Sequence, residues 1–174
     1  MVTFDSMIFI HIGNLFHQIS FVIILLKIFA SKNVRCLSLK SSILQCIVFY
    51  CRYMNMFWSH AHFLFTLTQI LYTLIATKLV YLIRFQKPYC LSYQNEFDSL
   101  NILYILIPCA VLSLFLTPQL FFLETFWMFS ILLEPLAAIP QIWMLQKMAG
   151  SEGGNVENLT ASYMGLWVYI EDAI

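Results

Sequence analysis

Residues 43–58 read ILQCIVFYCRYMNMFW, an apolar run that contains a single charged residue, Arg52. A guanidinium is costly in hydrocarbon, so it is retained there only with a partner group, a water-filled cavity or a bound anion. Lys40 precedes the run, and the polar pair Ser59-His60 follows it. We therefore predict a membrane span in which Arg52 marks a functional position.

The whole chain shares this apolar character. Of its 174 residues, 61% are hydrophobic and only 10% are charged, whereas soluble domains carry about 25% charged residues. The length allows five or six membrane helices of about 20 residues each and leaves no room for a soluble enzyme domain. The net charge of zero gives no indication of a nucleic-acid partner.

The side chains that usually carry chemistry are not arranged for it. The five cysteines are scattered, with no CxxC pair and no metal-ligand spacing, so we interpret them as apolar packing residues. No nucleophile–base pair, phosphate-binding loop or metal cluster can be recognised in the sequence. We therefore predict a protein that is not an enzyme and that needs no cofactor or metal.

Five segments are apolar and long enough to cross a bilayer, and each must be helical because open strands cannot satisfy their backbone groups in lipid. The five segments are 7–30, 39–58, 61–82, 100–117 and 120–145. The sequence therefore predicts an all-α integral membrane protein with a transmembrane bundle over residues 1–147. Residues 148–158, which contain three glycines, are expected to form a cytosolic loop. Residues 159–174 are expected to form a partial sixth helix.

The distribution of positive charge predicts the orientation. Eight of the nine Lys and Arg residues lie in or beside residues 27–40, residues 78–87 and Lys147. These positions correspond to the first, third and fifth connections, whereas the second and fourth carry no Lys or Arg. Basic loops stay on the cytosolic side, so we predict a lumenal N-terminus. Residues 1–16 lack the basic region and the cleavage site of a signal peptide, so we expect them to belong to the first span. The sequon at Asn158 should then be cytosolic and unmodified.

Polar residues near one face of the membrane outline a candidate site. Arg52 and Asn55 are three residues apart and share a helix face. Glu124 opens the fifth span and is expected at the depth of Arg52, in the lumenal third of the bilayer. The further residues around these positions are Tyr53 beside Arg52, Trp127 one turn below Glu124, and Glu134 near mid-membrane.

Two interpretations of this site remain open. In the first, Arg52 and Glu124 form an internal ion pair that holds two helices together. In the second, they line a lumen-facing cavity that binds a charged ligand. The planar fork of Arg52 suits a carboxylate, and Glu124 suits a cationic group, so the ligand would be a zwitterion or the end of a peptide.

The first span carries a polar stripe that includes His17. A buried histidine is commonly a packing residue with a satisfied hydrogen bond. An imidazole has an ordinary pKa of about 6.5, however, so it changes charge within the pH range of secretory compartments. His17 is therefore either a packing residue or a pH sensor.

Three stretches of the chain resemble the ER lumen protein-retaining receptors, or KDEL receptors. They are LLKIFASKNVRCLSLKSSIL (25–44), IVFYCRYMNMF (47–57) and LETFWMFSILLEPLAAIPQIWMLQK (123–147), and the similarity extends from about residue 9 to about residue 163. The resemblance implies a fold like that of the PQ-loop and sugar-transporter proteins, with two helix bundles around a lumenal cavity. That family has seven spans, so this chain, with five full spans and a partial sixth, is similar to a C-terminally shortened member.

The resemblance also implies a function. Such receptors bind the KDEL- or HDEL-type C-terminal tails of escaped soluble ER proteins in the acidic Golgi and return them in coat-protein vesicles. They reside in the membranes of the ER and the cis-Golgi and contact membrane lipids. By resemblance, Arg52 and Tyr53 would hold the carboxyl end of the tail, Glu124 and Trp127 would lie near its basic residue, and His17 would sense pH. Asn55 stands where the family has an aspartate.

Two alternatives belong to other functional classes. The chain could be a small-solute transporter on the same fold, in which Glu134 and Pro140-Gln141 would matter more than Arg52. It could also be a truncated paralogue that binds no ligand, because the cavity would lack the wall that the later spans of the family provide. Solute uptake by liposomes distinguishes the first alternative, and stabilisation by a free KDEL or HDEL peptide excludes the second.

Overall fold

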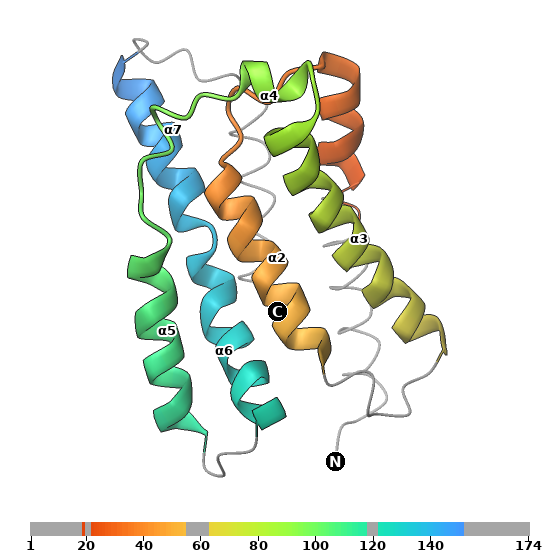
Figure 1. The fold of residues 1–174 in the computed structure, drawn as a ribbon, viewed down its shortest axis with the longest axis vertical. Helices are drawn as coiled ribbons and strands as arrows, with labels where there is room; N and C mark the ends of the chain where they lie inside the picture. The colour runs from red at the N-terminus through yellow and green to blue at the C-terminus, as the bar shows by residue number, and fades with distance from the viewer. Residues whose placement is uncertain (1–18, 20–21, 55–62, 118–121, 152–174) are drawn as a thin grey trace.

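The computed structural model describes residues 19, 22–54, 63–117 and 122–151, and these residues form helices joined by short connections, with no strand among them (Figure 1). This confirms the all-α prediction. His17, Asn55 and the predicted partial helix 159–174 lie outside the described residues. The helices, in chain order, are Val22–Ser31, α2 (Leu39–Tyr53), α3 (Phe63–Phe85), α4 (Tyr89–Ser92), α5 (Leu103–Leu116), α6 (Phe122–Leu136) and α7 (Ile139–Ser151).

Helix α2 is the central element of the fold and lies between α3 and α6 (Figure 1). It begins after Ser38, whose Oγ accepts a hydrogen bond from the backbone N–H of Ser41 at 3.1 Å. A serine in this position satisfies one of the backbone donors that a helix start leaves unpaired. Arg52 lies in the last turn, where its positive charge is favourable to the helix dipole.

Helices α6 and α7 follow one another with a bend at Ala137 and Ala138. Pro135 and Pro140 flank the bend, and a proline cannot donate the backbone hydrogen bond of a regular helix. Within the bend, the Ala137 carbonyl accepts a hydrogen bond from Ser41 Oγ of α2. Together the two helices form one stretch, Phe122–Met148, that is long and apolar enough to cross a membrane. The predicted span 120–145 is therefore bent, and helical structure continues to Ser151.

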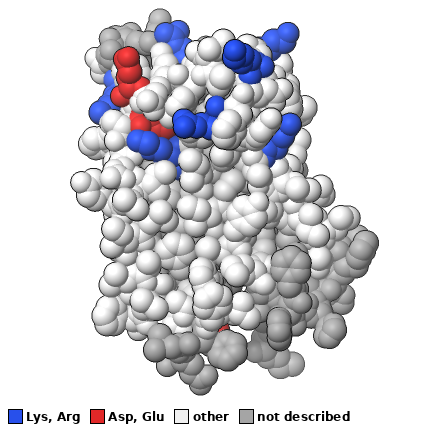
Figure 2. Space-filling model, in the orientation of Figure 1, with Lys and Arg blue, Asp and Glu red and all other residues white. Residues whose placement is uncertain are grey.

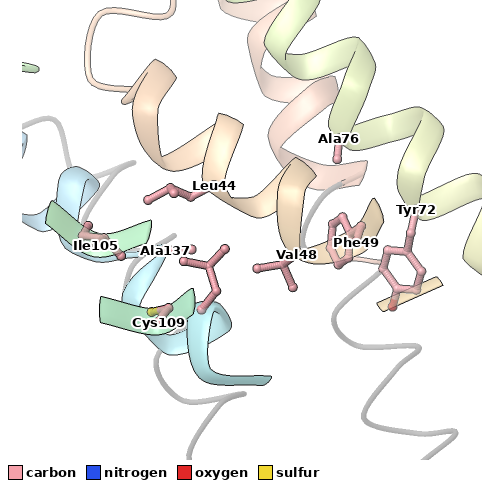
Figure 3. Close-up of a cluster of buried hydrophobic side chains, with 9 residues drawn as sticks. Leu44, Val48, Phe49, Tyr72, Ala76, Ile105, Cys109 and Ala137 are labelled. Atoms are coloured by element: carbon pink, nitrogen blue, oxygen red, sulfur yellow. The ribbon is translucent and has the colours of Figure 1, made fainter. Parts of the chain in front are cut away.

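The core lies where α2 meets its neighbours (Figure 3). It combines large side chains with small ones, and the small residues Ala76 and Ala137 let neighbouring helices approach closely. Phe49 of α2 also packs against Tyr72 of α3, with ring centroids 5.5 Å apart. The members of this cluster are Leu44, Val48, Phe49, Tyr72, Ala76, Ile105, Cys109, Leu133 and Ala137.

Charge is separated from apolar surface along the long axis of the molecule. Figure 2 shows Lys and Arg side chains, with a few Asp or Glu side chains, gathered at one end of the visible face, above a broad belt that is almost free of charged groups. We call this the basic end; it is formed by residues 31–40, residues 84–99 and α7. Large apolar side chains are exposed below it, among them Leu74 at 60% and Phe115 at 82%. An exposed apolar surface of this extent is typical of contact with lipid.

Candidate functional site

Arg52 of α2 and Glu134 of α6 form the central contact of the candidate site. Arg52 Nη1 donates to Glu134 Oε1 at 2.9 Å, and Nη2 donates to Oε2 at 2.5 Å. Two parallel bonds of this kind make the strongest and most directional ion pair available to arginine. About a quarter of each side chain remains exposed, 25% for Arg52 and 23% for Glu134. The ion pair is therefore mostly buried, and part of each side chain remains exposed at the protein surface.

Ser130 supplies a third contact to the guanidinium. Arg52 Nε donates to Ser130 Oγ at 3.4 Å, and that hydroxyl in turn donates to the Trp127 carbonyl at 2.7 Å. Ser130 is fully buried, and it lies four residues before Glu134 on the same face of α6. All three nitrogens of the guanidinium therefore bond to α6: Nη1 and Nη2 to Glu134, and Nε to Ser130.

The antiparallel course of α2 and α6 explains why these residues meet. Ser41, near the start of α2, contacts Ala137, whereas Arg52, near its end, contacts Ser130 and Glu134, which come earlier in the chain than Ala137. Helical side chains lean toward the N-terminus of their own helix. In an antiparallel pair, Arg52 and Glu134 consequently lean toward each other and meet between their Cα positions.

Comparison with known proteins identifies the family. Residues 33–170 match the family model described as ER lumen protein retaining receptor. The chain is 34% identical to ER lumen protein-retaining receptor A of Arabidopsis thaliana over 157 residues, covering 90% of this chain and 71% of the relative. It is 35% identical to the ER lumen protein-retaining receptor of Plasmodium falciparum (92% and 72% covered) and 36% identical to ER lumen protein-retaining receptor 3 of Danio rerio (87% and 67%).

The chain belongs to the ER lumen protein-retaining receptor family. The family resemblance inferred from the sequence is thus confirmed. The names of the relatives describe retention receptors and not enzymes. Proteins of this family are ER and Golgi membrane proteins, which agrees with the apolar belt of the described residues.

The structure does not show an ion pair between Arg52 and Glu124, which was the first of the two interpretations, because Arg52 pairs with Glu134. Glu124 is exposed in the first turn of α6, ten positions before Glu134, which corresponds to about 15 Å along the helix axis. Its side chain leans toward the start of α6, away from Glu134.

The other predicted site residues that the structure describes differ in how closely they contact the Arg52–Glu134 pair. Tyr53 follows Arg52 but stacks on Phe49, with centroids 6.0 Å apart and planes at 4°. Trp127 is 48% exposed, and its carbonyl is linked to Arg52 through Ser130. Within the described residues, the candidate site of this chain therefore consists of Arg52, Ser130 and Glu134, with Trp127 at its edge.

A second polar cluster, at the basic end, was not predicted from the sequence. Asp98 is only 1% exposed there and accepts hydrogen bonds from Ser38 and Tyr93. Gln141 of the Pro140-Gln141 pair lies beside it, 3% exposed. The sequence indicated a role for Pro140-Gln141 in the alternative of a small-solute transporter, and it contained no local signal that Asp98 would be buried.

Proposed function

We propose that this protein is a receptor that retrieves soluble ER proteins by binding their KDEL- or HDEL-type C-terminal tails. The observation that carries the proposal is the bidentate contact of Arg52 with a carboxylate, because a peptide's terminal carboxylate has the same planar geometry. Glu134 occupies the fork of Arg52, so the terminal carboxylate of a tail would take the place of Glu134. The names of the relatives support the same role.

The remaining site residues receive their roles from this geometry and from the family. Arg52, with Tyr53 and Asn55, would hold the carboxyl end of the tail. Glu124 and Trp127, both exposed on the first turns of α6, would lie along the tail nearer its basic residue. His17 would sense pH: its protonated form would favour the bound state in the acidic Golgi, and loss of the proton would release the tail in the ER.

The orientation and the complete fold are part of the proposal. We place the N-terminus in the lumen and the basic end in the cytosol, supported by the gathering of Lys and Arg at one end. The chain would span the membranes of the ER and the cis-Golgi several times as a PQ-loop-like bundle. The basic end would then face anionic lipids and the coat-protein vesicle machinery.

A peptide-binding measurement tests the proposed function. The purified chain is titrated with a KDEL-type peptide at pH 5.5 and at pH 7.4, and we expect tighter binding at pH 5.5. Two matched changes remove opposite halves of the same contact: Arg52→Ala in the protein, and amidation of the C-terminus of the peptide. Each should weaken binding by about tenfold or more, because a charge-assisted hydrogen bond contributes about 1.5–3 kcal/mol. Equal affinity for the free and the amidated peptide would contradict the proposal.

A further inference from the structure

Gln45 of α2 carries a buried polar atom that has no partner among the described residues. Its side chain is only 5% exposed, and no hydrogen bond to its Nε2 is formed within the part of the chain that the structure describes. The amide nitrogen of glutamine only donates hydrogen bonds, and a buried donor that stays unpaired destabilises a folded protein. One explanation is that an acceptor reaches this nitrogen only when the protein binds its ligand.

Gln45 lies on the same face of α2 as Arg52. The two residues are seven positions apart, which is two turns of the helix, or about 10.5 Å along its axis. The Arg52 side chain leans toward the start of α2 and therefore toward Gln45. The unpaired donor thus lies on the face of α2 from which Arg52 reaches Glu134.

The contact between Ser41 and the Ala137 carbonyl determines which part of α6 lies opposite Gln45. Because α2 and α6 are antiparallel, a step of four residues forward from Ser41 corresponds to a step of about four residues back from Ala137. The first step leads to Gln45, and the second leads to the peptide unit between Leu133 and Glu134. The backbone of Glu134 is therefore at about the same height in the bundle as Gln45.

In the empty protein, the Glu134 side chain extends away from this height to reach Arg52. It leans toward the start of α6, and both carboxylate oxygens bond to the guanidinium. A Glu and a Gln side chain that extend toward each other can bridge the distance of about 8–10 Å between packed helices. Gln45 Nε2 therefore lies within reach of the Glu134 carboxylate, but Arg52 holds that carboxylate elsewhere.

We propose that Gln45 is a positioning residue that receives the Glu134 carboxylate when a tail takes its place at Arg52. This inference rests on the proposed function. A tail carboxylate that occupies both Nη atoms of Arg52 leaves Glu134 without its donors, and an ionised carboxylate without donors is strongly unfavourable in an apolar bundle. A change of side-chain rotamer brings Glu134 back to the height of Gln45, whose Nε2 donates to it. Binding thus also pairs a donor that was unpaired in the empty protein.

Replacing Gln45 by methionine distinguishes this role from a purely structural one. Gln45→Met nearly keeps the length and volume of the side chain but removes the donor. Without peptide, the variant should melt at the same temperature as the wild type or at a higher one, because an unpaired buried donor is lost. Its affinity for a KDEL-type peptide at pH 5.5 should nevertheless fall by about tenfold, which corresponds to one hydrogen bond to a charged group.

The amidated peptide and two further variants make the test specific. The amidated peptide has no terminal carboxylate to displace Glu134, so Gln45→Met should leave its weaker affinity unchanged within about twofold. In a Glu134→Ala background there is no carboxylate to receive, so Gln45→Met should have no further effect on the affinity for the free peptide. Gln86→Met is the matched control, because Gln86 Oε1 is also buried and unpaired among the described residues but lies after the end of α3. It should change the affinity for neither peptide.

The outcomes separate the role of Gln45 from the receptor function. Unchanged affinity of Gln45→Met for the free peptide, or an equal loss for the free and the amidated peptide, overturns the role of Gln45 and leaves the receptor function standing. A lower melting temperature without peptide would show that Gln45 has a partner in the empty protein. Gln45→Leu then repeats the measurement, and a loss of stability in both variants overturns the proposal. Absence of peptide binding by the wild-type chain overturns the receptor function, and the role of Gln45 with it.

Discussion

Arg52 and Glu134 are 82 positions apart in the chain, yet they form two parallel hydrogen bonds of 2.9 and 2.5 Å. The pair neutralises two charges inside an apolar bundle and at the same time presents an arginine fork already shaped for a carboxylate. One contact thus serves both the stability of the empty protein and the proposed recognition of a tail. Replacing Arg52 or Glu134 should therefore change both the unfolding free energy and the affinity for a tail, but by different amounts.

Removing one member of the pair should destabilise the protein strongly. Glu134→Gln leaves the guanidinium without its counter-charge, and we expect a loss of about 2–3 kcal/mol of unfolding free energy. This is somewhat below the cost of about 3–5 kcal/mol for breaking a fully buried pair, because about a quarter of each side chain is exposed. Thermal unfolding in detergent measures the loss.

The double variant Arg52→Gln/Glu134→Gln is the control for this prediction. Because it removes both charges, it should be less destabilised than the sum of the two single variants, by about 1–3 kcal/mol. Strict additivity would show that Arg52 and Glu134 do not interact in the folded protein.

Glu124 should behave in the opposite way to Glu134. Its side chain is exposed in the first turn of α6, so Glu124→Gln should change the unfolding free energy by less than about 0.5 kcal/mol. It should nevertheless weaken the binding of a tail that carries a basic residue. The affinity for a tail that has a neutral residue at that position should not change. Calorimetric titration with the two peptides gives this comparison, and equal losses for both peptides would remove Glu124 from the proposed pocket.

Because of Tyr93 at the basic end, we expect the protein to lose stability at alkaline pH. Burial, reinforced by the hydrogen bond to Asp98, raises the pKa of the Tyr93 hydroxyl well above its ordinary value near 10. A raised pKa in the folded state contributes stability that is fully present below pH 10 and is lost as the pH rises above it, because only the unfolded chain releases the proton. The loss reaches at most about 1.4 kcal/mol per pH unit, and partial exposure of the ring reduces it.

Tyr93→Phe tests this directly. The variant lacks the titrating hydroxyl, so its melting temperature should fall less steeply between pH 10 and pH 11.5 than that of the wild type. Below pH 9 it should be somewhat less stable than the wild type, because Asp98 has lost a donor. Parallel curves above pH 10 would show that another group causes the alkaline loss.

Sequence patterns predicted the features that depend on residues close together in the chain. The start of α2 at Leu39 and the grouping of Lys and Arg follow from local composition, and Arg52 was conspicuous because its neighbours are apolar. The bend after Leu136 was not predicted. Although two prolines are visible in the sequence, the bend also contains a contact from another helix, the hydrogen bond from Ser41 to the Ala137 carbonyl, which no local pattern predicts.

The partners of the key charges could not be predicted for the same reason. Two carboxylates on α6 lay within range of Arg52, and only the antiparallel packing and the lean of the side chains select Glu134. Asp98 lies in a polar connection, where a single aspartate is ordinarily solvated. Its burial depends on Ser38 and Tyr93, which approach it only in the folded protein.

The core around α2 should be sensitive to cavities even though lipid surrounds the protein. Leu44 is fully buried in the core cluster, whereas Leu74 of α3 is 60% exposed on the apolar belt. Because lipid is as apolar as leucine, moving the Leu44 side chain from lipid to the core contributes little free energy. Leu44→Ala should therefore destabilise the protein mainly through lost packing contacts, by about 1–3 kcal/mol. Leu74→Ala leaves no cavity because lipid fills the space, and it should cost less than about 0.5 kcal/mol. Reversible unfolding in mixed micelles compares the two variants, and equal costs would mean that α2 is not packed against α3 and α6 as described.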